Sequence, residues 1–398
     1  MPVANPNSRI YFDYNATTPL SPGAIEAVTA TMRDQFGNAS SVHRFGQQAK
    51  ARLDEARSEV AALAGADPSE IVFTSGGTEA DNFAIRGAAD AAEPTGRRHL
   101  VASAIEHEAV LNTLRALARR GWAVTLLPVD QSGIVDPARL RDAITSETSL
   151  VSVMHANNEI GTIQPIAELA AIAREHGALM HTDAVQSGGK LPLDARALGV
   201  DLLSLSAHKF NGPKGAGALF VRRGTRMLPI LTGGKHERNR RAGTENVPAI
   251  AGMGVAAAEA RGKLAAESVR LAALRDRLET GVLAAVPGTA VNGDPARRVP
   301  NTTNISFDRV EAESLLIALD LEGIAVSTGS ACSSGTLEPS HVLRAMGLPP
   351  HRTQNSLRFS LGLFSTAAEV DRLLEVLPGL VEKLRGLTRR PQPARTSS

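Results

Sequence analysis

The sequence predicts an α/β fold built on a mainly parallel sheet, because short apolar segments alternate with amphipathic helical segments between about residues 20 and 225. The clearest helical segments are Gln47–Leu63, Leu111–Arg120 and Ile166–His176, and a glycine that favours a helix end follows each closely. The other segments have the composition of strands that are buried on both faces of a sheet. These seven candidate strands are Ile71–Ser75, Leu100–Ser103, Val124–Val129, Leu150–His155, Leu179–Ala184, Leu202–Ser206 and Gly217–Val221.

A smaller α+β domain is expected after a long helix. The Gly-, Arg- and Lys-rich segment 232–246 predicts an exposed loop, and an Ala-rich helix follows from about Pro248 to Ala285. Beyond it, Asn304–Phe307 and Ser356–Leu361 have the pattern of strands, and Glu313–Leu321 has that of a helix. We therefore expect a large domain over residues 16–260, a small domain over 1–15 and 261–387 with a loop at about 323–337, and a disordered tail over 388–398.

The composition excludes several classes of protein. The 398 residues include 43 basic and 41 acidic side chains, which gives no reason to expect a nucleic-acid or membrane partner. We find neither a signal peptide nor an apolar run of about 18 residues, so a cytoplasmic protein is expected. The single cysteine, Cys332, excludes an intramolecular disulfide and a multi-cysteine metal site.

A Gly-rich turn follows the first predicted strand. In Ser75-Gly76-Gly77-Thr78-Glu79, small residues allow a close approach of the backbone, and the helix that begins near Thr78 offers free N–H groups to an anion such as phosphate. An ordinary strand-to-helix connection explains the same residues at least as well.

Polar side chains also end two later strands. Asp183 ends an apolar strand, where open α/β sheets place their ligands, and it suits either a protonated ring nitrogen or a helix N-cap. Lys209 follows the strand Leu202–Ser206 and precedes a turn-rich stretch. Most lysines are solvated surface groups, but a lysine beside apolar and cationic neighbours can have its pKa lowered enough to form a Schiff base.

These sites together match the needs of pyridoxal 5′-phosphate (PLP). This cofactor requires a lysine for its aldehyde, an acid for its pyridine nitrogen and donors for its phosphate. Lys209 and Asp183 meet the first two needs, and Thr78, Ser206 and His208 can meet the third. The predicted strand Leu100–Ser103 is followed by His107, whose imidazole could stack on the ring, although a lone histidine is more often structural.

Cys332 lies in a run of small polar residues, Ser327-Thr328-Gly329-Ser330-Ala331-Cys332-Ser333-Ser334-Gly335. A lone cysteine is usually a small buried hydrophobe. This neighbourhood is polar and contains two glycines, which indicates a mobile loop that could bring a thiol to a substrate sulfur. The local sequence alone does not predict that Cys332 lies near Lys209 in the folded protein.

Taken together, these residues resemble the cysteine desulfurases of the nitrogen-fixation and iron–sulfur-assembly type, within the class-V aminotransferases. The resemblance runs from Tyr11 to Gly362, nearly the whole chain apart from its C-terminal tail. Its most specific stretches are His155-Ala156-Asn157-Asn158-Glu159-Ile160-Gly161-Thr162, Ser206-Ala207-His208-Lys209-Phe210, Arg241-Ala242-Gly243-Thr244-Glu245-Asn246 and the segment around Cys332.

The resemblance implies an aminotransferase-like PLP fold (fold type I) and a homodimer. It implies that Lys209 binds the cofactor aldehyde and takes the α-proton of L-cysteine, that Cys332 becomes a persulfide, and that alanine is the product. His107 would relay protons, Asn158 and Arg358 would bind substrate, and Thr244 would reach the phosphate of the neighbouring subunit. The implied cofactor contacts are Gly77, Thr78, His107, Asn158, Asp183, Gln186, Ser206, His208, Lys209 and Thr244.

The sulfur is expected to pass to an acceptor or iron–sulfur scaffold protein, whose identity the sequence leaves open. No structural metal site is expected, although Cys332 could transiently ligate an iron–sulfur cluster. The loop pattern Cys332-Ser333-Ser334-Gly335 is closer to the nitrogen-fixation branch, but that does not fix a biological role. The alternatives are an aminotransferase or selenocysteine lyase on the same fold, and, from a different class, a sulfur-relay or scaffold-binding module without catalysis.

Overall fold

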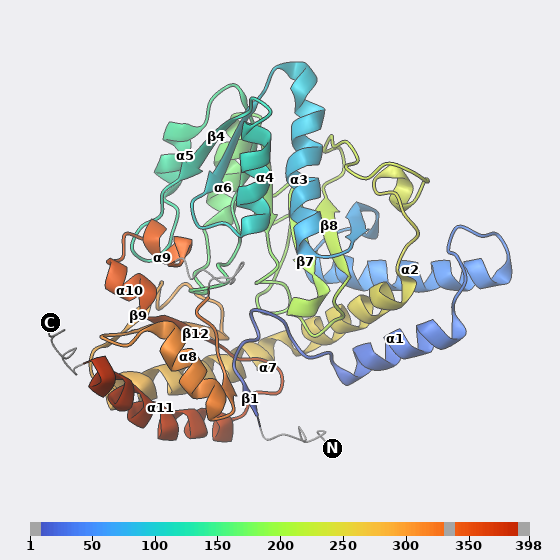
Figure 1. The fold of residues 1–398 in the computed structure, drawn as a ribbon. Coiled ribbons are helices and arrows are strands. Elements are labelled where there is room, and N and C mark those ends of the chain that lie inside the picture. The colour runs from blue at the N-terminus through green and yellow to red at the C-terminus, as the bar shows by residue number, and fades with distance from the viewer. Residues whose placement is uncertain (1–8, 330–338, 389–398) are drawn as a thin grey trace, which may run out of the picture.

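The computed structural model describes residues 9–329 and 339–388. A seven-stranded sheet has the order β2-β8-β7-β6-β5-β3-β4, and only β8 runs antiparallel to its neighbours (Figure 1). All seven predicted strands are therefore confirmed, although four of them end one to three residues earlier than predicted because the backbone leaves the sheet there. The strands are β2 (Ile71–Thr74), β3 (His99–Ser103), β4 (Ala123–Leu127), β5 (Thr148–Ser152), β6 (Leu179–Asp183), β7 (Leu202–Ser206) and β8 (Gly217–Val221).

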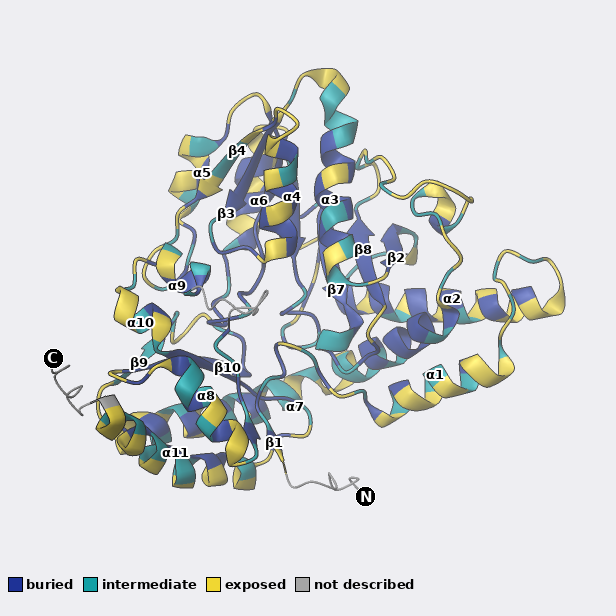
Figure 2. Ribbon diagram, viewed as in Figure 1, coloured by how far each residue is buried: buried dark blue, intermediate teal, exposed yellow. Residues whose placement is uncertain are grey.

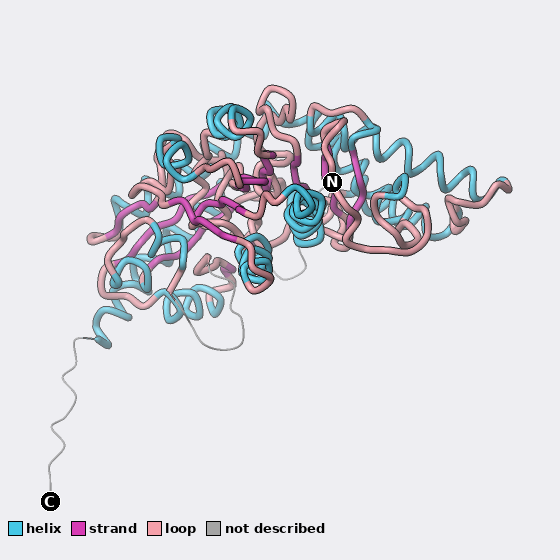
Figure 3. Tube along the Cα trace, turned by 90° about the horizontal axis from the view of Figure 1, so that it is seen from above, coloured by secondary structure: helices cyan, strands magenta, loops and turns pink. Residues whose placement is uncertain are grey.

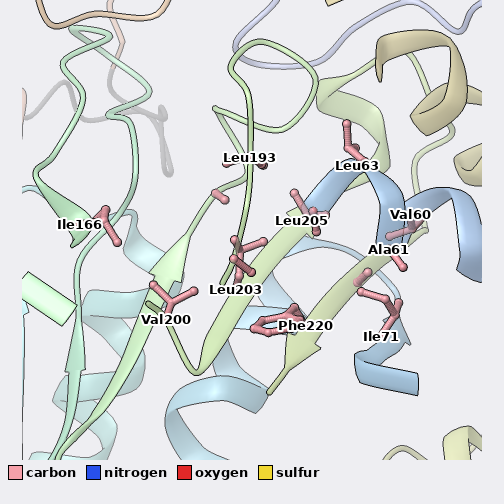
Figure 4. Close-up of a cluster of buried hydrophobic side chains, with 14 of the residues drawn as sticks. Val60, Ala61, Leu63, Ile71, Ile166, Leu193, Val200, Leu203, Leu205 and Phe220 are labelled. Carbon is pink, nitrogen blue, oxygen red and sulfur yellow. The ribbon is translucent and has the colours of Figure 1, made fainter. Parts of the chain in front are cut away.

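Successive residues of these strands pack on opposite faces of the sheet, which explains their continuous apolar sequences. Leu203 and Phe220 belong to a core shared with α2, α6 and α7 (Figure 4), whereas Leu202 and Leu219 pack against α3 and α4. Helices accordingly lie on both sides of the strands (Figure 3). The helices of this part are α1 (Pro22–Asp34), α2 (Arg44–Ala64), α3 (Gly77–Ala92), α4 (Glu108–Ala118), α5 (Pro137–Ala143) and α6 (Ile166–Glu175).

The long helix α7 (Val247–Ala285) connects this part to a second, smaller one (Figure 1). Its first turns contribute Met253 to the core of the large sheet, and its later turns contribute Leu278 to a separate core. The N-terminal strand β1 (Ile10–Tyr11) packs in that second core and pairs with β11 (Ile324–Ala325). Two separate cores joined by α7 are consistent with a division into a large and a small domain. The exact domain boundaries remain a prediction.

The smaller part contains an antiparallel sheet with the order β12-β10-β9, as its α+β class predicts. Among the described helices, none is long and apolar enough to cross a membrane. The predicted tail after Thr388 and residues 330–337 of the predicted Cys332 loop lie outside the described ranges, whereas residues 323–329 are described. The remaining elements are β9 (Thr289–Asn292), β10 (Thr302–Phe307), β12 (Ser356–Ser360), α8 (Ala312–Leu321), α9 (His341–Ala345), α10 (Pro350–Gln354) and α11 (Ala367–Thr388).

The segment 232–246 is largely exposed, as predicted, but Glu237 is an exception (Figure 2). Glu237 is only 6% exposed and pairs with Arg57 of α2. The segment is therefore attached to the large sheet by a buried ion pair, which composition alone did not predict.

Candidate active site

A cavity of about 350 Å³ lies where the parallel strands end, between the large sheet and the smaller part. The carboxyl ends of parallel strands meet at one edge of a sheet, and ligands bind there in open α/β folds. Arg358 of β12 reaches the same cavity from the smaller part. Of the ten predicted cofactor residues, nine line the cavity: Gly77, Thr78, His107, Asn158, Asp183, Gln186, Ser206, His208 and Lys209.

The N-terminus of α3 forms one wall of this cavity. Gly76 precedes the helix with φ 155°, and no side chain caps the helix, so its first N–H groups are available to a ligand. A Cβ atom built on Gly77 would lie 2.9 Å from Val185 Cγ2, so only glycine fits there. The hydroxyl of Ser206 lies beside the same turn. This arrangement is suited to bind a phosphate group.

Asp183 is the last residue of β6 and is buried in the wall of the cavity. Its Oδ1 accepts a hydrogen bond from the backbone N–H of Val185 at 2.9 Å, which fixes the carboxylate. Among the described residues, no cationic side chain forms an ion pair with it. Burial raises the pKa of Asp183, so a cationic ligand group beside it would be strongly favoured.

Lys209 lies at the end of a short 3₁₀ helix directly after β7. Its Nζ donates to the backbone carbonyl oxygens of Asn15 at 2.6 Å and Ala16 at 2.8 Å. Burial, followed by the positive charge of Arg358, lowers the pKa of Lys209 to about 8. The neutral amine that attacks an aldehyde is therefore far more abundant near neutral pH than in an exposed lysine.

Two histidines of the cavity have defined partners. His107 caps α4, and its Nδ1 accepts from the backbone N–H of Ala109 at 3.1 Å, so Nε2 is the nitrogen left for a ligand. Nδ1 of His208 lies 3.1 Å from the hydroxyl oxygen of Thr17. Burial and the charge of Lys209 lower the pKa of His208 to about 4, so this imidazole is neutral near pH 7.

The cavity wall facing Lys209 carries Arg358, which is 3% exposed. Its Nη2 donates to Oδ1 of Asp13 at 2.5 Å, and its Nη1 donates to the backbone carbonyl oxygen of Asn158 at 2.9 Å. The Nε atom is buried and has no hydrogen-bond partner within residues 9–329 and 339–388. A fixed guanidinium with free donor capacity is suited to bind a carboxylate.

Two predicted site residues are not placed in this cavity, because Thr244 lies outside it and Cys332 is not among the described residues. Thr244 is exposed and outside it, so within one chain Thr244 is not a cofactor contact. Cys332 lies outside the described residues, between Gly329 at the cavity and Pro339. The predicted juxtaposition of Cys332 with Lys209 therefore stays a prediction.

Sequence reasoning missed three polar residues of the site. Asn15 is buried and accepts from Lys209 through its backbone oxygen, Asp81 lines the cavity, and Lys190 lies behind Gln186. Asn15 was within a stretch that carried the family resemblance, which was the one available signal. Nothing in the local pattern of Asp81 or Lys190 distinguishes them from exposed helix or turn residues.

A group of buried acids lies beneath the cavity. Burial and the neighbouring Asp183 raise the pKa of Asp81 well above its usual range, and among the described residues its Oδ1 has no hydrogen-bond partner. Burial raises the pKa of Glu106 to about 8. Burial also lowers the pKa of His181 to about 3, so neutral forms dominate around Asp183 in the absence of a ligand. No group of three or more metal-ligating side chains occurs within residues 9–329 and 339–388.

The donor set fits PLP. The uncapped helix turn with its glycine cradle suits the phosphate, Asp183 suits the ring nitrogen, and the amine of Lys209 suits the aldehyde. Fold and site thus define a PLP-dependent enzyme with the aminotransferase-like fold.

Residues 10–373 match the family model of the class-V aminotransferases, and the chain belongs to this family. Over 386 residues it is 49% identical to the cysteine desulfurase IscS of Methanosarcina thermophila, covering 97% of this chain and 95% of that protein. The structure of a NifS-like protein superposes with a TM-score of 0.89 and 36% identity, over 94% of this chain and 100% of the other. The structure of SspA in complex with cysteine gives a TM-score of 0.79 and 35% identity, over 90% and 100%.

Proposed function

We propose that this protein is a cysteine desulfurase that takes the sulfur atom of L-cysteine with PLP bound at Lys209 and transfers it to Cys332. The observation that carries the proposal is the placement of Lys209, Asp183 and Arg358 around one cavity, in a chain about half identical to named cysteine desulfurases. Bound PLP supplies an electron sink for the charge that develops at the substrate α-carbon.

The residues of the cavity bind the substrate and transfer its protons. Arg358 binds the substrate carboxylate together with Asn158, which fixes the α-carbon over Lys209. The Lys209 amine, once released from the cofactor, removes the α-proton, and its lowered pKa keeps it available as a base. His107 would stack on the bound cofactor and would pass a proton from Nε2, because its Nδ1 accepts from Ala109. Asp183 would hold the proton of the ring nitrogen.

Cys332 performs the transfer of sulfur. Its thiolate attacks the substrate sulfur, a sulfur–sulfur bond forms, and the carbon–sulfur bond breaks with its electron pair going to the substrate carbon. Protonation of that carbon gives alanine. L-cysteine and the Cys332 thiol thus yield L-alanine and a Cys332 persulfide, a balance that needs no external oxidant. The persulfide then passes its sulfur to an acceptor or iron–sulfur scaffold protein, and its sensitivity to oxidation favours the cytoplasm.

We also propose a homodimer. Large apolar side chains are exposed on α1, α2 and the connection between them, which extends away from the sheet (Figure 2). Exposed apolar side chains of this kind mark interaction surfaces. Thr244 lies outside its own cavity, and the family resemblance implies that in a homodimer it contacts the phosphate bound by the partner subunit. These side chains are Ile25 (52% exposed), Met32 (65%), Phe36 (74%), Val42 (90%) and Phe45 (51%).

The test measures alanine and sulfide released from L-cysteine under a reductant, with the wild type, C332A and K209A side by side. We expect equal amounts of the two products from the wild type, and neither from the variants. C332A should still bind PLP and absorb visible light. Full turnover by C332A would reject the persulfide assignment. Loss of the amine to a keto acid without sulfide would favour an aminotransferase, and a much higher rate with selenocysteine would favour a lyase.

A further inference from the structure

Lys190 is a buried lysine behind the active-site cavity, with 8% of its surface exposed. Its Nζ donates to Oε1 of Gln186 at 2.8 Å and to Oδ1 of Asn15 at 3.1 Å. No carboxylate forms an ion pair with it in the described part of the chain. Burying an amino group without a counter-ion destabilises the fold, so its two hydrogen bonds are the features that can offset this cost.

These contacts fix the orientation of the Gln186 side-chain amide. Burial, followed by the charges of Lys209 and Arg358, lowers the pKa of Lys190 well below its usual range, but the amine donates to Oε1 of Gln186 in either protonation state, so Oε1 faces Lys190. The Nε2 atom donates to the backbone carbonyl oxygen of Asn15 at 3.0 Å, and that oxygen only accepts. A flipped amide would place Oε1 of Gln186 against the backbone oxygen of Asn15. It would also place the Nε2 hydrogens of Gln186 against those of the Lys190 amine. The second N–H of Nε2 is therefore the donor that Gln186, which lines the cavity, has left for a ligand.

We propose that Lys190 is a positioning residue, which holds Gln186 so that it presents an N–H donor, and never an acceptor, to the cofactor ring oxygen. The inference rests on the proposed function and on a contact between Gln186 and the ring hydroxyl oxygen of PLP, which the resemblance to the cysteine desulfurases implies. A fixed donor stabilises the deprotonated oxygen, because hydrogen bonds to a charged form favour that form. The same Asn15 carbonyl accepts from Lys209, which links the orientation of Gln186 to the amine at the reaction centre.

The apparent pKa of the PLP-loaded enzyme, followed through its visible absorbance, reports this hydrogen bond. When the donor is lost, the deprotonated oxygen is less stable and the apparent pKa rises by about one pH unit, the size expected for a hydrogen bond to a charged group. We expect this rise in Q186L and in K190M. The other charged or titratable groups around the cavity are unchanged in both variants: Asp81, His107, Asp183, His208, Lys209 and Arg358.

A double-mutant cycle separates orientation from a direct effect of charge. If Lys190 acts through Gln186, K190M causes no further shift of the apparent pKa in the Q186L background. If the Lys190 charge acts directly, the shifts of the two single variants add in the double variant. The matched control is K263M, because Lys263 lines a neighbouring cavity together with Lys190 but is exposed. Its apparent pKa should equal that of the wild type. K190A replaces K190M in the cycle if the latter does not fold.

The outcomes are distinct. An unchanged apparent pKa in Q186L overturns the proposed contact of Gln186 with the cofactor. A raised apparent pKa in Q186L with an unchanged apparent pKa in the Lys190 variant overturns only the role of Lys190. So does a shift in the double variant that equals the sum of the two single shifts. A shift common to all three variants and absent from K263M supports the inference.

Discussion

Arg358 and Asp13 form an ion pair in which the Nη2 to Oδ1 distance is 2.5 Å, and Arg358 is almost fully buried. Asp13 follows β1, at the end of the chain far from Arg358 in sequence. The pair fixes the guanidinium that we propose as the ligand of the substrate carboxylate.

The first prediction concerns this pair. D13A removes the acceptor that orients Arg358, so we expect the KM for L-cysteine to rise about tenfold, with a smaller change in kcat. D13N keeps an oxygen that accepts from Nη2 and should stay within about threefold of the wild type. Steady-state kinetics with varied L-cysteine measures both. Equal KM values for D13A and the wild type would show that Arg358 does not need Asp13.

Part of the site was predictable from the local sequence because Asp183 and Lys209 lie at or just after the ends of strands, whereas Arg358 was expected only from the family resemblance. Asp183 and Lys209 come directly after apolar strands, and parallel strands bring such ends together. Lys190 and Asp81 were not predictable, since their burial depends on contacts with residues distant in the sequence, such as Asn15 and His181. Thr244 remains a family-based prediction, because its partner would be another chain.

The second prediction follows from the lowered pKa of Lys209. The neutral amine attacks the cofactor aldehyde, and its fraction rises about tenfold per pH unit until the pH reaches about 8. The rate of PLP uptake by apoprotein should therefore rise to about pH 8 and then level off. Stopped-flow absorbance at several pH values measures this rate.

The charge of Arg358 is one cause of that shift, so R358M should move the midpoint of the uptake profile upward. R33M, at an exposed arginine of α1, is the control and should leave the profile unchanged. A midpoint near the usual lysine value in the wild type would contradict the prediction.

The third prediction concerns Glu106, which is fully buried and accepts from Ser103 and from the Met154 N–H. Its pKa of about 8 in the fold lies above the unfolded value, so the folded apoprotein holds a proton that the unfolded chain has released. Stability is therefore lost as the pH rises from about 4.5 to about 8, by about 1.4 kcal/mol per pH unit for one proton.

E106Q removes this proton linkage and keeps an oxygen that accepts both hydrogen bonds. We expect E106Q apoprotein to be more stable than the wild type at pH 8, with the difference shrinking toward pH 5. Urea unfolding at several pH values gives the free energies. The control is E147Q, at an exposed position, for which no such trend is expected. A constant difference between E106Q and the wild type across this range would contradict the assignment.

The last prediction concerns the ion pair that attaches the segment 232–246. Glu237 accepts from Arg57 through both carboxylate oxygens, at 2.7 and 2.8 Å, and from the Phe73 N–H at 3.0 Å. E237A leaves the Arg57 charge buried and unpaired, so we expect a loss of about 3 kcal/mol or more in the free energy of unfolding. Urea denaturation of the apoprotein measures it.

A second variant separates this charge effect from the loss of the loop attachment. R57M/E237L replaces both charges with apolar side chains of similar size and should recover most of the stability. It would not restore the attachment through the Phe73 N–H. If the attached segment presents Thr244 to a partner subunit, both variants should bind PLP more weakly than the wild type, whatever their stability. Recovery of PLP affinity together with stability in R57M/E237L would show that the attachment of the loop by Glu237 has no part in binding the cofactor.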